Sequence, residues 1–422
     1  MVTTVLTHPE IKSCQFDVVD TTRRTVTMAT LKPRNRPSTP AKHPFDLPDG
    51  LQRQLARAQA NMAAPFKGIT TDGYVRPGLY ALRQTRISVQ PIIDAAETFL
   101  VSLSPDARVT ASFDVDSVEW RNWSNIHPYL CRHGVCLDDL HDDQKHAALA
   151  LVRASLSAAG YATARNVMKL NEHIREITSR DAEYSEWYYW MSVFGTPSAT
   201  APWGWQIDGH HLIVNCFVLG DQLVMAPTFM GSEPVAAAFG KYAGTRIFHD
   251  EEAKGFTLMR TLTPAQQQKA RIGMELPVDV FTSGFRDNVE IPSEGIRYGE
   301  LSPEQQGLLV SLLETYVGRI RPGHTEIKLA EVQQHLPDTL FAWIGPCDEV
   351  SPFYYRIYSP VLLIEFDHQS GIALDNDEPS RQHIHTVVRT PNGNDYGKDL
   401  LRQHYEHFDH THPYTLHRLG TR

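Results

Sequence analysis

The chain has 422 residues, of which 41% are hydrophobic and 21% are charged, and its formal net charge is −9. This length and composition are typical of a globular protein with two or three structural lobes. A net negative charge gives no electrostatic attraction to the phosphate backbone of a nucleic acid, so we expect no nucleic-acid partner.

The apolar runs of the chain are short. None approaches the roughly 20 residues that a membrane helix needs, and the first ten residues lack the basic start and long apolar stretch of a signal peptide. The cysteines are few, scattered and odd in number, which indicates reduced thiols: Cys14, Cys131, Cys136, Cys216 and Cys347. We therefore expect a soluble, cytoplasmic protein that does not contact a membrane.

The first part of the chain divides into an arm and a helical region. Residues 1–45 are expected to form a flexible or edge-strand N-terminal arm, because the stretch from Arg34 to Pro44 is rich in proline and polar residues. Residues 46–186 are expected to form a helical lobe. Apolar spacing and capping residues place its helices at 51–60, 92–103, 142–159 and 161–176.

From residue 187 to the end we expect a mixed α/β lobe. Alternating and β-branched runs predict strands at 187–195, 204–219, 222–229, 340–344, 354–358, 361–367 and 383–390. Helices are predicted at 263–274, 302–320, 326–335 and 398–407, and the first two begin with Thr-Pro or Ser-Pro. The predicted fold class is α+β, with a helical N-terminal lobe packed on a mostly antiparallel β-sheet with peripheral helices.

Two neighbouring strands carry imidazoles and carboxylates at alternate positions. His383 and His385 share one face of their strand, and Glu365 and Asp367 share one face of theirs, because strand side chains alternate. His211 stands in a third strand-like run, 209–215. Imidazole and carboxylate are common ligands of Zn, Fe or Mn, so we predict that His211, Glu365, His383 and His385 bind a divalent transition metal.

Four further residues complete the candidate catalytic set. Asp367 would act as an acid or base, and Arg389 would hold an anionic group of the substrate. His210 and Asn215 lie in a strand that is largely apolar on both faces, where a polar side chain needs a partner. The alternative is a structural hydrogen-bond network in which Arg389 neutralises Asp367 or Glu365.

Several segments carry a specific resemblance. Residues 202–211 read Pro-Trp-Gly-Trp-Gln-Ile-Asp-Gly-His-His. Other segments, of different sequence, carry the same resemblance, at 68–73, 120–125, 363–367, 383–389 and 395–401. With these motifs the chain resembles, over most of its length, a bacterial family catalogued only as a domain of unknown function, DUF3500. It departs from many members at Asp367-His368, where they carry Asp-Asn. The resemblance implies no activity, so function rests on the residues themselves.

Three functional hypotheses remain open from these residues. The leading one is a metal-dependent hydrolase acting on a small polar or anionic substrate. A non-haem iron oxygenase or lyase is the second, because two histidines and one carboxylate also suit Fe²⁺. The third is a metal-free protein that binds a small metabolite. A small-molecule substrate is the expected partner, and the oligomeric state stays open, a homo-oligomer included.

Overall fold

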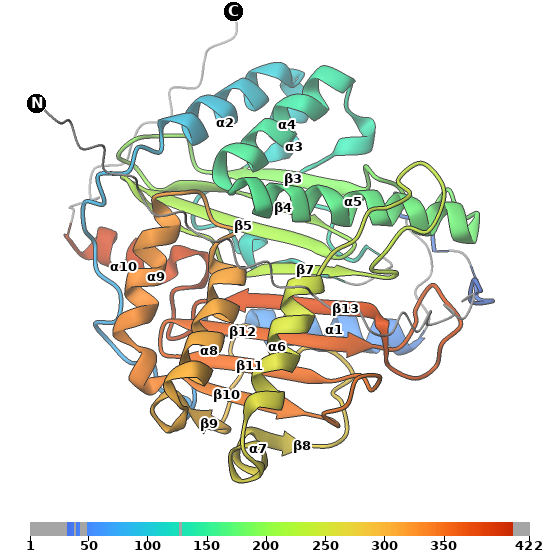
Figure 1. Cartoon of the computed structure of the whole chain (residues 1–422). Coiled ribbons are helices and arrows are strands. Elements are labelled where there is room, and N and C mark those ends of the chain that lie inside the picture. Colours follow the sequence, from blue (N-terminus) through green and yellow to red (C-terminus); the bar gives the residue numbers. More distant parts are fainter. Residues whose placement is uncertain (1–31, 38, 43–48, 126–128, 408–422) are drawn as a thin grey trace, which may run out of the picture. The chain divides into compact units, whose positions relative to one another are not determined.

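The computed structural model describes residues 32–407 except 38, 43–48 and 126–128 (Figure 1). The edge strand predicted at 16–28 therefore lies outside the described residues. The described residues from Lys32 onward belong to one compact unit. The described part of the arm is anchored to it, because Pro33 forms a β-bridge with Leu374 and the Arg34 N–H donates to the Ala373 carbonyl at 2.7 Å.

One large sheet runs through this unit. Its main path is β1 (Ser112–Phe113), β3 (Tyr189–Phe194), β4 (Trp203–Gly209), β5 (Leu212–Leu219), β7 (Thr228–Ser232), β13 (Ser380–Arg389), β12 (Leu362–Gln369), β11 (Tyr354–Ser359), β10 (Leu340–Ile344) and β8 (Arg271–Gly273). Three short strands pair at its sides: β2 (Val135–Cys136) with β3, β6 (Gln222–Val224) with β5, and β9 (Ile296–Arg297) with β10. Among these strands only the β1–β3 and β10–β8 pairs are parallel, which confirms a mostly antiparallel sheet.

The described helices are α1 (Asp49–Ala63), α2 (Gln90–Ser102), α3 (Pro105–Ala111), α4 (Asp142–Ser155), α5 (Ala158–Thr178), α6 (His249–Thr261), α7 (Pro264–Ala270), α8 (Pro303–Val317), α9 (His324–Gln334) and α10 (Lys398–His407). The predicted starts of α7 and α8 are confirmed by their caps. The hydroxyls of Thr263 and Ser302 each accept a backbone N–H of the first turn at 3.3 Å, and proline follows each cap. The α+β class is confirmed.

Some single elements were missed or predicted wrongly, and the strand predicted at 222–229 is two strands, β6 and β7. Helix α6 was not predicted, because Gly255 in its middle lowers helix propensity by about 1 kcal/mol relative to alanine. The glycine is needed there: a Cβ atom would lie 2.3 Å from the Tyr355 ring. The helix predicted at 263–274 ends at Ala270, because residues 271–273 join the sheet as β8. The strand predicted at 204–219 is a hairpin, since His210 and His211 form a two-residue turn between β4 and β5.

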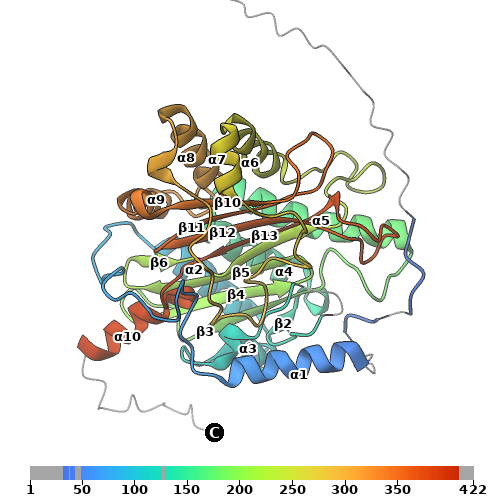
Figure 2. The same ribbon diagram turned by 90° about the horizontal axis from the view of Figure 1, so that it is seen from below.

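The register gives the sheet two different faces. Met230, Ile364 and Ile384 point to an apolar face. Helix α5 packs on β5 and β7 there, and α6 packs on β11 through Gly255. In Figure 2, α6, α8 and α9 lie on one side of the strands and α1 lies on the other.

The opposite face is polar and buried. It carries His385, Asp367 and Arg389, because Asp367 pairs with His385 across the β12–β13 ladder and Arg389 follows at even spacing. The segments 118–125, 279–291 and 391–396, in which only short 3-10 turns are helical, contact this face. The expected coincidence of the polar faces of β12 and β13 is therefore confirmed by the register.

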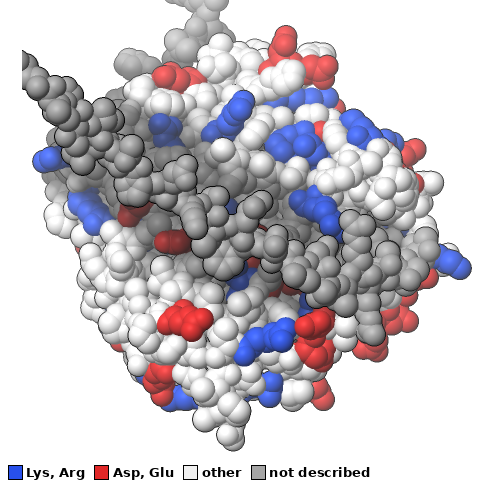
Figure 3. Space-filling model, viewed as in Figure 1, with Lys and Arg blue, Asp and Glu red and all other residues white. Residues whose placement is uncertain are grey.

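One large hydrophobic cluster, beside three smaller ones among the described residues, joins the helical region to the sheet. It includes Phe99 of α2 and Leu151 of α4 together with strand residues as far along the chain as Val387. Among the described residues, no helix is both long and apolar enough for a membrane crossing. On the face of the molecule shown in Figure 3, the described basic and acidic side chains are intermixed.

Candidate metal centre

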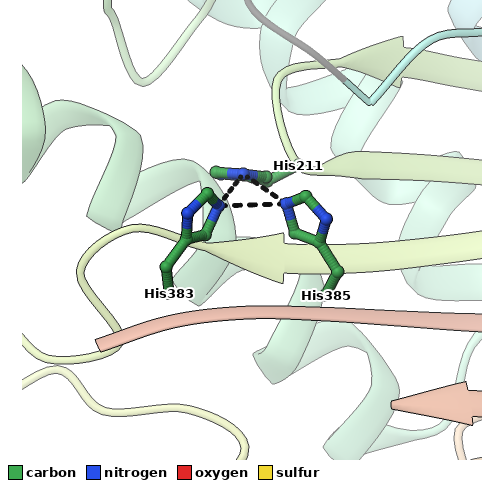
Figure 4. Close-up of side chains that lie close together, drawn as sticks. All are labelled: His211, His383 and His385. Carbon is green, nitrogen blue, oxygen red and sulfur yellow. Dashed lines mark hydrogen bonds between the residues drawn. The ribbon is translucent and has the colours of Figure 1, made fainter. Parts of the chain in front are cut away.

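Three histidine side chains meet on the polar face of the sheet (Figure 4). The Nε2 atom of His211 lies 3.1 Å from the Nε2 atoms of His383 and His385, and these two atoms are 3.0 Å apart. All three side chains are buried. Among the described residues, they are the group of histidine, cysteine or carboxylate side chains close enough to hold one metal ion.

The position of His211 depends on a strained turn. Its φ is 64°, in the left-handed region that a residue with a Cβ atom adopts at a cost of roughly 1–2 kcal/mol. Backbone hydrogen bonds hold it there: its N–H donates to Asn125 at 3.3 Å, and its carbonyl accepts from Gly231 at 2.8 Å. His210 stacks on the imidazole with ring centroids 3.9 Å apart. The strain is thus kept at the point where it directs the imidazole toward β13.

Gly231 of β7 forms the floor beneath two of the imidazoles. A Cβ atom at this position would lie 2.8 Å from the Ile384 carbonyl oxygen, 2.9 Å from Cδ2 of His385 and 3.1 Å from Cδ2 of His211. Only glycine lets the backbone of β7 pass this close to the rings.

We therefore expect Gly231→Ala to destabilise the protein by about 1–3 kcal/mol, as overpacking does, and to weaken zinc binding by pushing the imidazoles apart. Urea denaturation and zinc titration measure the two effects. Gly307→Ala in α8 is the matched control, because no atom lies within 4 Å of its Cβ position. Equal behaviour of the two variants would contradict this account of Gly231.

In two of the imidazoles the outer nitrogen, Nδ1, already makes a hydrogen bond. Nδ1 of His383 lies 2.7 Å from the Ser370 carbonyl oxygen, and Nδ1 of His385 lies 2.8 Å from Oδ1 of Asp279. Both partners can only accept, so each Nδ1 carries the proton and donates it. Burial and the neighbouring His385 hold the pKa of His383 well below its ordinary value, which keeps this ring neutral. The inner Nε2 atom of His383 is therefore an unprotonated lone pair that faces the other two Nε2 atoms.

Three ring nitrogens that lie 3.0–3.1 Å from one another need a proton or a metal ion between them, because their lone pairs would otherwise repel one another. A single proton on Nε2 of His211 would relieve only part of the repulsion among the three Nε2 atoms. A metal ion about 2.0–2.1 Å from each nitrogen serves all three. The Nδ1 hydrogen bonds to a carboxylate and a carbonyl are the outer contacts that metal-binding histidines commonly make.

Glu365 is not brought to the three histidines. It lies opposite Val387, one alternation further along the ladder than His385. Its oxygens accept from the Phe281 and Thr282 N–H groups at 2.7 and 2.9 Å, and from the Thr282 and Tyr354 hydroxyls. Four donors saturate the carboxylate, so the structure offers three histidines where the sequence predicted three histidines and Glu365.

Asp367 does lie beside the histidines, directly opposite His385 on the same face. Its Oδ2 accepts from the Gln369 side chain, whereas its buried Oδ1 has no hydrogen-bond partner among the described residues. Burial, followed by the charges of Asp279 and Glu365, raises the pKa of Asp367 well above its ordinary value. This carboxyl therefore keeps its proton to a higher pH than an exposed aspartate does.

The other predicted catalytic residues have structural partners. Arg389 is fully buried and pairs with Asp287 at 2.7 Å and Asp395 at 2.8 Å, so its charge is not available to a substrate. This arrangement is a hydrogen-bond network of the predicted kind, but with different carboxylates than Asp367 or Glu365. Asn215 accepts from Gln206 at 2.6 Å and donates to the Pro227 carbonyl at 2.9 Å.

His210 also points away from the three Nε2 atoms. Its Nδ1 lies 2.8 Å from the Asn171 side-chain oxygen on α5, and its ring supports His211 by stacking. It thus contributes to the site through His211.

The sequence reasoning missed Asp279, Ser370 and Gly231. Asp279 and Ser370 stand in loops with no local pattern, and only the fold brings them to Nδ1 of His385 and His383. Gly231 did carry a signal, because an isolated glycine inside a strand often marks a close backbone approach.

Comparison with known proteins gives one match. The model of a family described as "Protein of unknown function (DUF3500)" matches residues 85–398, which include all three histidines. No curated protein and no solved structure matches the chain.

Proposed function

We propose that this chain, which belongs to the DUF3500 family of proteins of unknown function, is a metal-dependent enzyme and acts as a hydrolase on a small polar substrate. His211, His383 and His385 would hold a divalent transition metal (Zn, Fe or Mn). The observation that carries the proposal is the approach of their three Nε2 atoms to 3.0–3.1 Å, while Nδ1 of His383 and of His385 is hydrogen-bonded on the outer side.

The chemistry of the ligand set favours hydrolysis over oxidation. Three neutral imidazoles with an open coordination position are a known zinc arrangement that activates water. An iron oxygenase of the common kind needs two histidines and one carboxylate, whereas the group of described side chains close enough to hold one ion contains three histidines and no carboxylate. An ion held by the three imidazoles would supply Lewis-acid activation of water or of a substrate oxygen.

Two aspartates of the chain would hold or transfer protons beside that ion. Asp279 accepts the His385 Nδ1–H and so fixes the ring orientation and raises the basicity of Nε2. Asp367, with its raised pKa and unpartnered Oδ1, would give a proton to a leaving group or take one from water. A hydrolase needs one such group beside the activated water.

Metal analysis tests the proposal first. Protein purified without a His-tag should contain about one equivalent of a transition metal, or should take up about one equivalent of zinc, iron or manganese after treatment with a chelator. The reloaded protein is then assayed on small esters, amides, lactones and phosphate esters, with the chelated protein as the blank. Protein that contains no metal and binds none on titration would overturn the proposal and leave the metal-free alternative.

The role of Asp367 makes a separate prediction. Asp367→Asn should lower turnover by roughly 10²–10⁴-fold, the usual contribution of a general acid or base, while metal content stays unchanged. The substitution keeps the shape of the side chain and removes only its proton chemistry. Asp377→Asn is the control, because that side chain is 82% exposed. Full activity of Asp367→Asn, or loss of its metal, would contradict the assigned role.

A further inference from the structure

The loop that carries the hydrogen-bond partner of His383 has little regular structure of its own. Residues 370–379 connect β12 to β13 and contain only one isolated β-bridge. Ser370 comes directly after the end of β12, and its carbonyl oxygen lies 2.7 Å from Nδ1 of His383. No strand ladder fixes this carbonyl, so its position depends on what holds the loop.

A single buried carboxylate holds this loop from the inside. Glu233 follows β7 directly and is 2% exposed. Its two oxygens accept the backbone N–H groups of Ile372, Ala373 and Leu374 at 3.0–3.1 Å. Ala373 and Leu374 are themselves buried, so their N–H groups cannot turn to water instead. Arg34 of the arm donates to carbonyl oxygens of the same loop at 3.1 and 3.2 Å, so the loop is held on both sides.

The Glu233 carboxylate does not bond the imidazole directly. Its Oε2 lies 3.9 Å from Nδ1 of His383, beyond hydrogen-bond distance, and the proton on that nitrogen is donated to the Ser370 carbonyl. The three N–H groups that the carboxylate binds begin two residues after Ser370. The influence of Glu233 on the imidazole therefore passes through the backbone of the loop.

We propose that Glu233 is a positioning residue of the metal centre. By holding the backbone of residues 372–374, it keeps the Ser370 carbonyl where that oxygen fixes the proton on Nδ1 of His383. The Nε2 atom of the ring is then unprotonated and faces the other two histidines, as a ligand nitrogen must. This assignment rests on the proposed metal site for its purpose, but its first test needs no metal ion.

The tautomers of the imidazoles in the metal-free protein provide that test. Glu233→Gln replaces one acceptor oxygen by an NH₂ group, which opposes the N–H groups of the loop and should release it. Proton–nitrogen correlation NMR of the imidazoles should show His383 with its proton on Nδ1 in the parent, and with the Nε2–H tautomer also populated in the variant. His385 should keep its proton on Nδ1 in both proteins, because Asp279 accepts it.

The internal comparison of the two rings separates positioning from general loosening of the fold. A His383 tautomer that stays unchanged in Glu233→Gln would overturn the proposal, and so would equal changes at His383 and His385. If Glu233→Gln does not fold, Glu233→Asp serves in its place, because it keeps the carboxylate and withdraws it from the loop by one methylene group. The same change at His383 alone is expected there, to a smaller extent.

Zinc titration measures the consequence for the metal centre. Glu233→Gln should bind zinc about 10–100-fold more weakly than the parent, as removal of an outer contact to a ligand histidine does. Glu251→Gln is the matched control, because Glu251 is also buried but pairs with Arg319 and lies on α6, which packs on the apolar face. It should lower stability and leave zinc affinity unchanged.

The titration also distinguishes this proposal from the proposed function. A parent protein that binds zinc, with a Glu233→Gln variant that binds it equally well, would refute the positioning role alone. A parent that binds no metal would refute the metal site, and the tautomer of His383 would then decide whether Glu233 positions this ring.

Discussion

His385→Ala should leave the protein folded but weaken its metal binding by more than about 100-fold. Removal of an outer contact to a ligand histidine already costs 10–100-fold, and His385 would be a ligand itself, 3.0 and 3.1 Å from the other two Nε2 atoms. Metal analysis of the purified variant and zinc titration measure the loss. Activity should fall with metal content and should not return on addition of excess metal.

The stability of the His385→Ala variant distinguishes a metal-binding role of the three histidines from a purely structural one. Without metal, His385→Ala removes one of three crowded nitrogens and should cost no more than an ordinary large-to-small change in a core. With metal, only the parent should gain stability, by the amount that binding supplies through mass action. If both proteins contain no metal and the variant alone unfolds, the histidines serve the fold.

His368→Gln is the matched control for this experiment. His368 is equally buried, but it points to the opposite face of the sheet, where it meets the Phe353 backbone and Glu252. Its substitution should lower stability without loss of metal. Metal loss in this variant would show that the assay reports unfolding rather than ligand removal.

Arg389→Met should be among the most destabilising substitutions in the chain, at about 3–5 kcal/mol, the cost of removing one partner of a buried ion pair. The guanidinium is fully buried and lies between Asp287 and Asp395, with a third hydrogen bond of 2.7 Å to the Thr282 carbonyl. Asp287 would keep Arg121, whereas Asp395 would lose its ion-pair partner. Urea denaturation measures the loss.

The loss should also depend on pH. Burial raises the pKa of Asp395, and the charge of Arg389 opposes that rise in the parent protein. Without Arg389 the folded carboxyl holds its proton still more tightly, while in the unfolded chain it ionises near 3.9. The folded state then binds the extra proton, so stability falls as pH rises from about 4 through the folded pKa. The difference between variant and parent should be larger at pH 8 than at pH 5.

Arg381→Met, on the same strand, is the control for both measurements. Arg381 is 26% exposed and pairs with the partly exposed Glu252 at 3.4 Å, so its loss should cost at most about 1 kcal/mol. If Arg389→Met is as mild as this control, the buried ion pairs do not hold the loop of residues 391–396 on the sheet. Metal content should stay unchanged in the folded fraction of both variants.

Local chemistry in the sequence determined many elements of this protein. Strand alternation placed His383 and His385 on one face of their strand and Asp367 on one face of its own strand, and the register then puts Asp367 directly opposite His385. Thr263-Pro264 and Ser302-Pro303 fixed two helix starts through a capping hydroxyl and a proline in the first turn. These features depend on neighbours within a few residues, and that is the range over which a sequence pattern can be read.

The tertiary structure decided which of the candidate residues meet. Strand β7 lies between β5 and β13, and Gly231 lets the His211 turn approach His385 across it. Glu365 cannot bind a metal because it is hydrogen-bonded to Thr282, 83 residues earlier. Arg389 cannot bind a substrate because it is paired with Asp287, 102 residues earlier. Such contacts depend on loops that carry no periodic signal, and a carboxylate can bind a metal only if no loop has already supplied its donors. The sequence alone therefore determined which faces are polar, and the loops packed on those faces decided which polar groups remain available for chemistry.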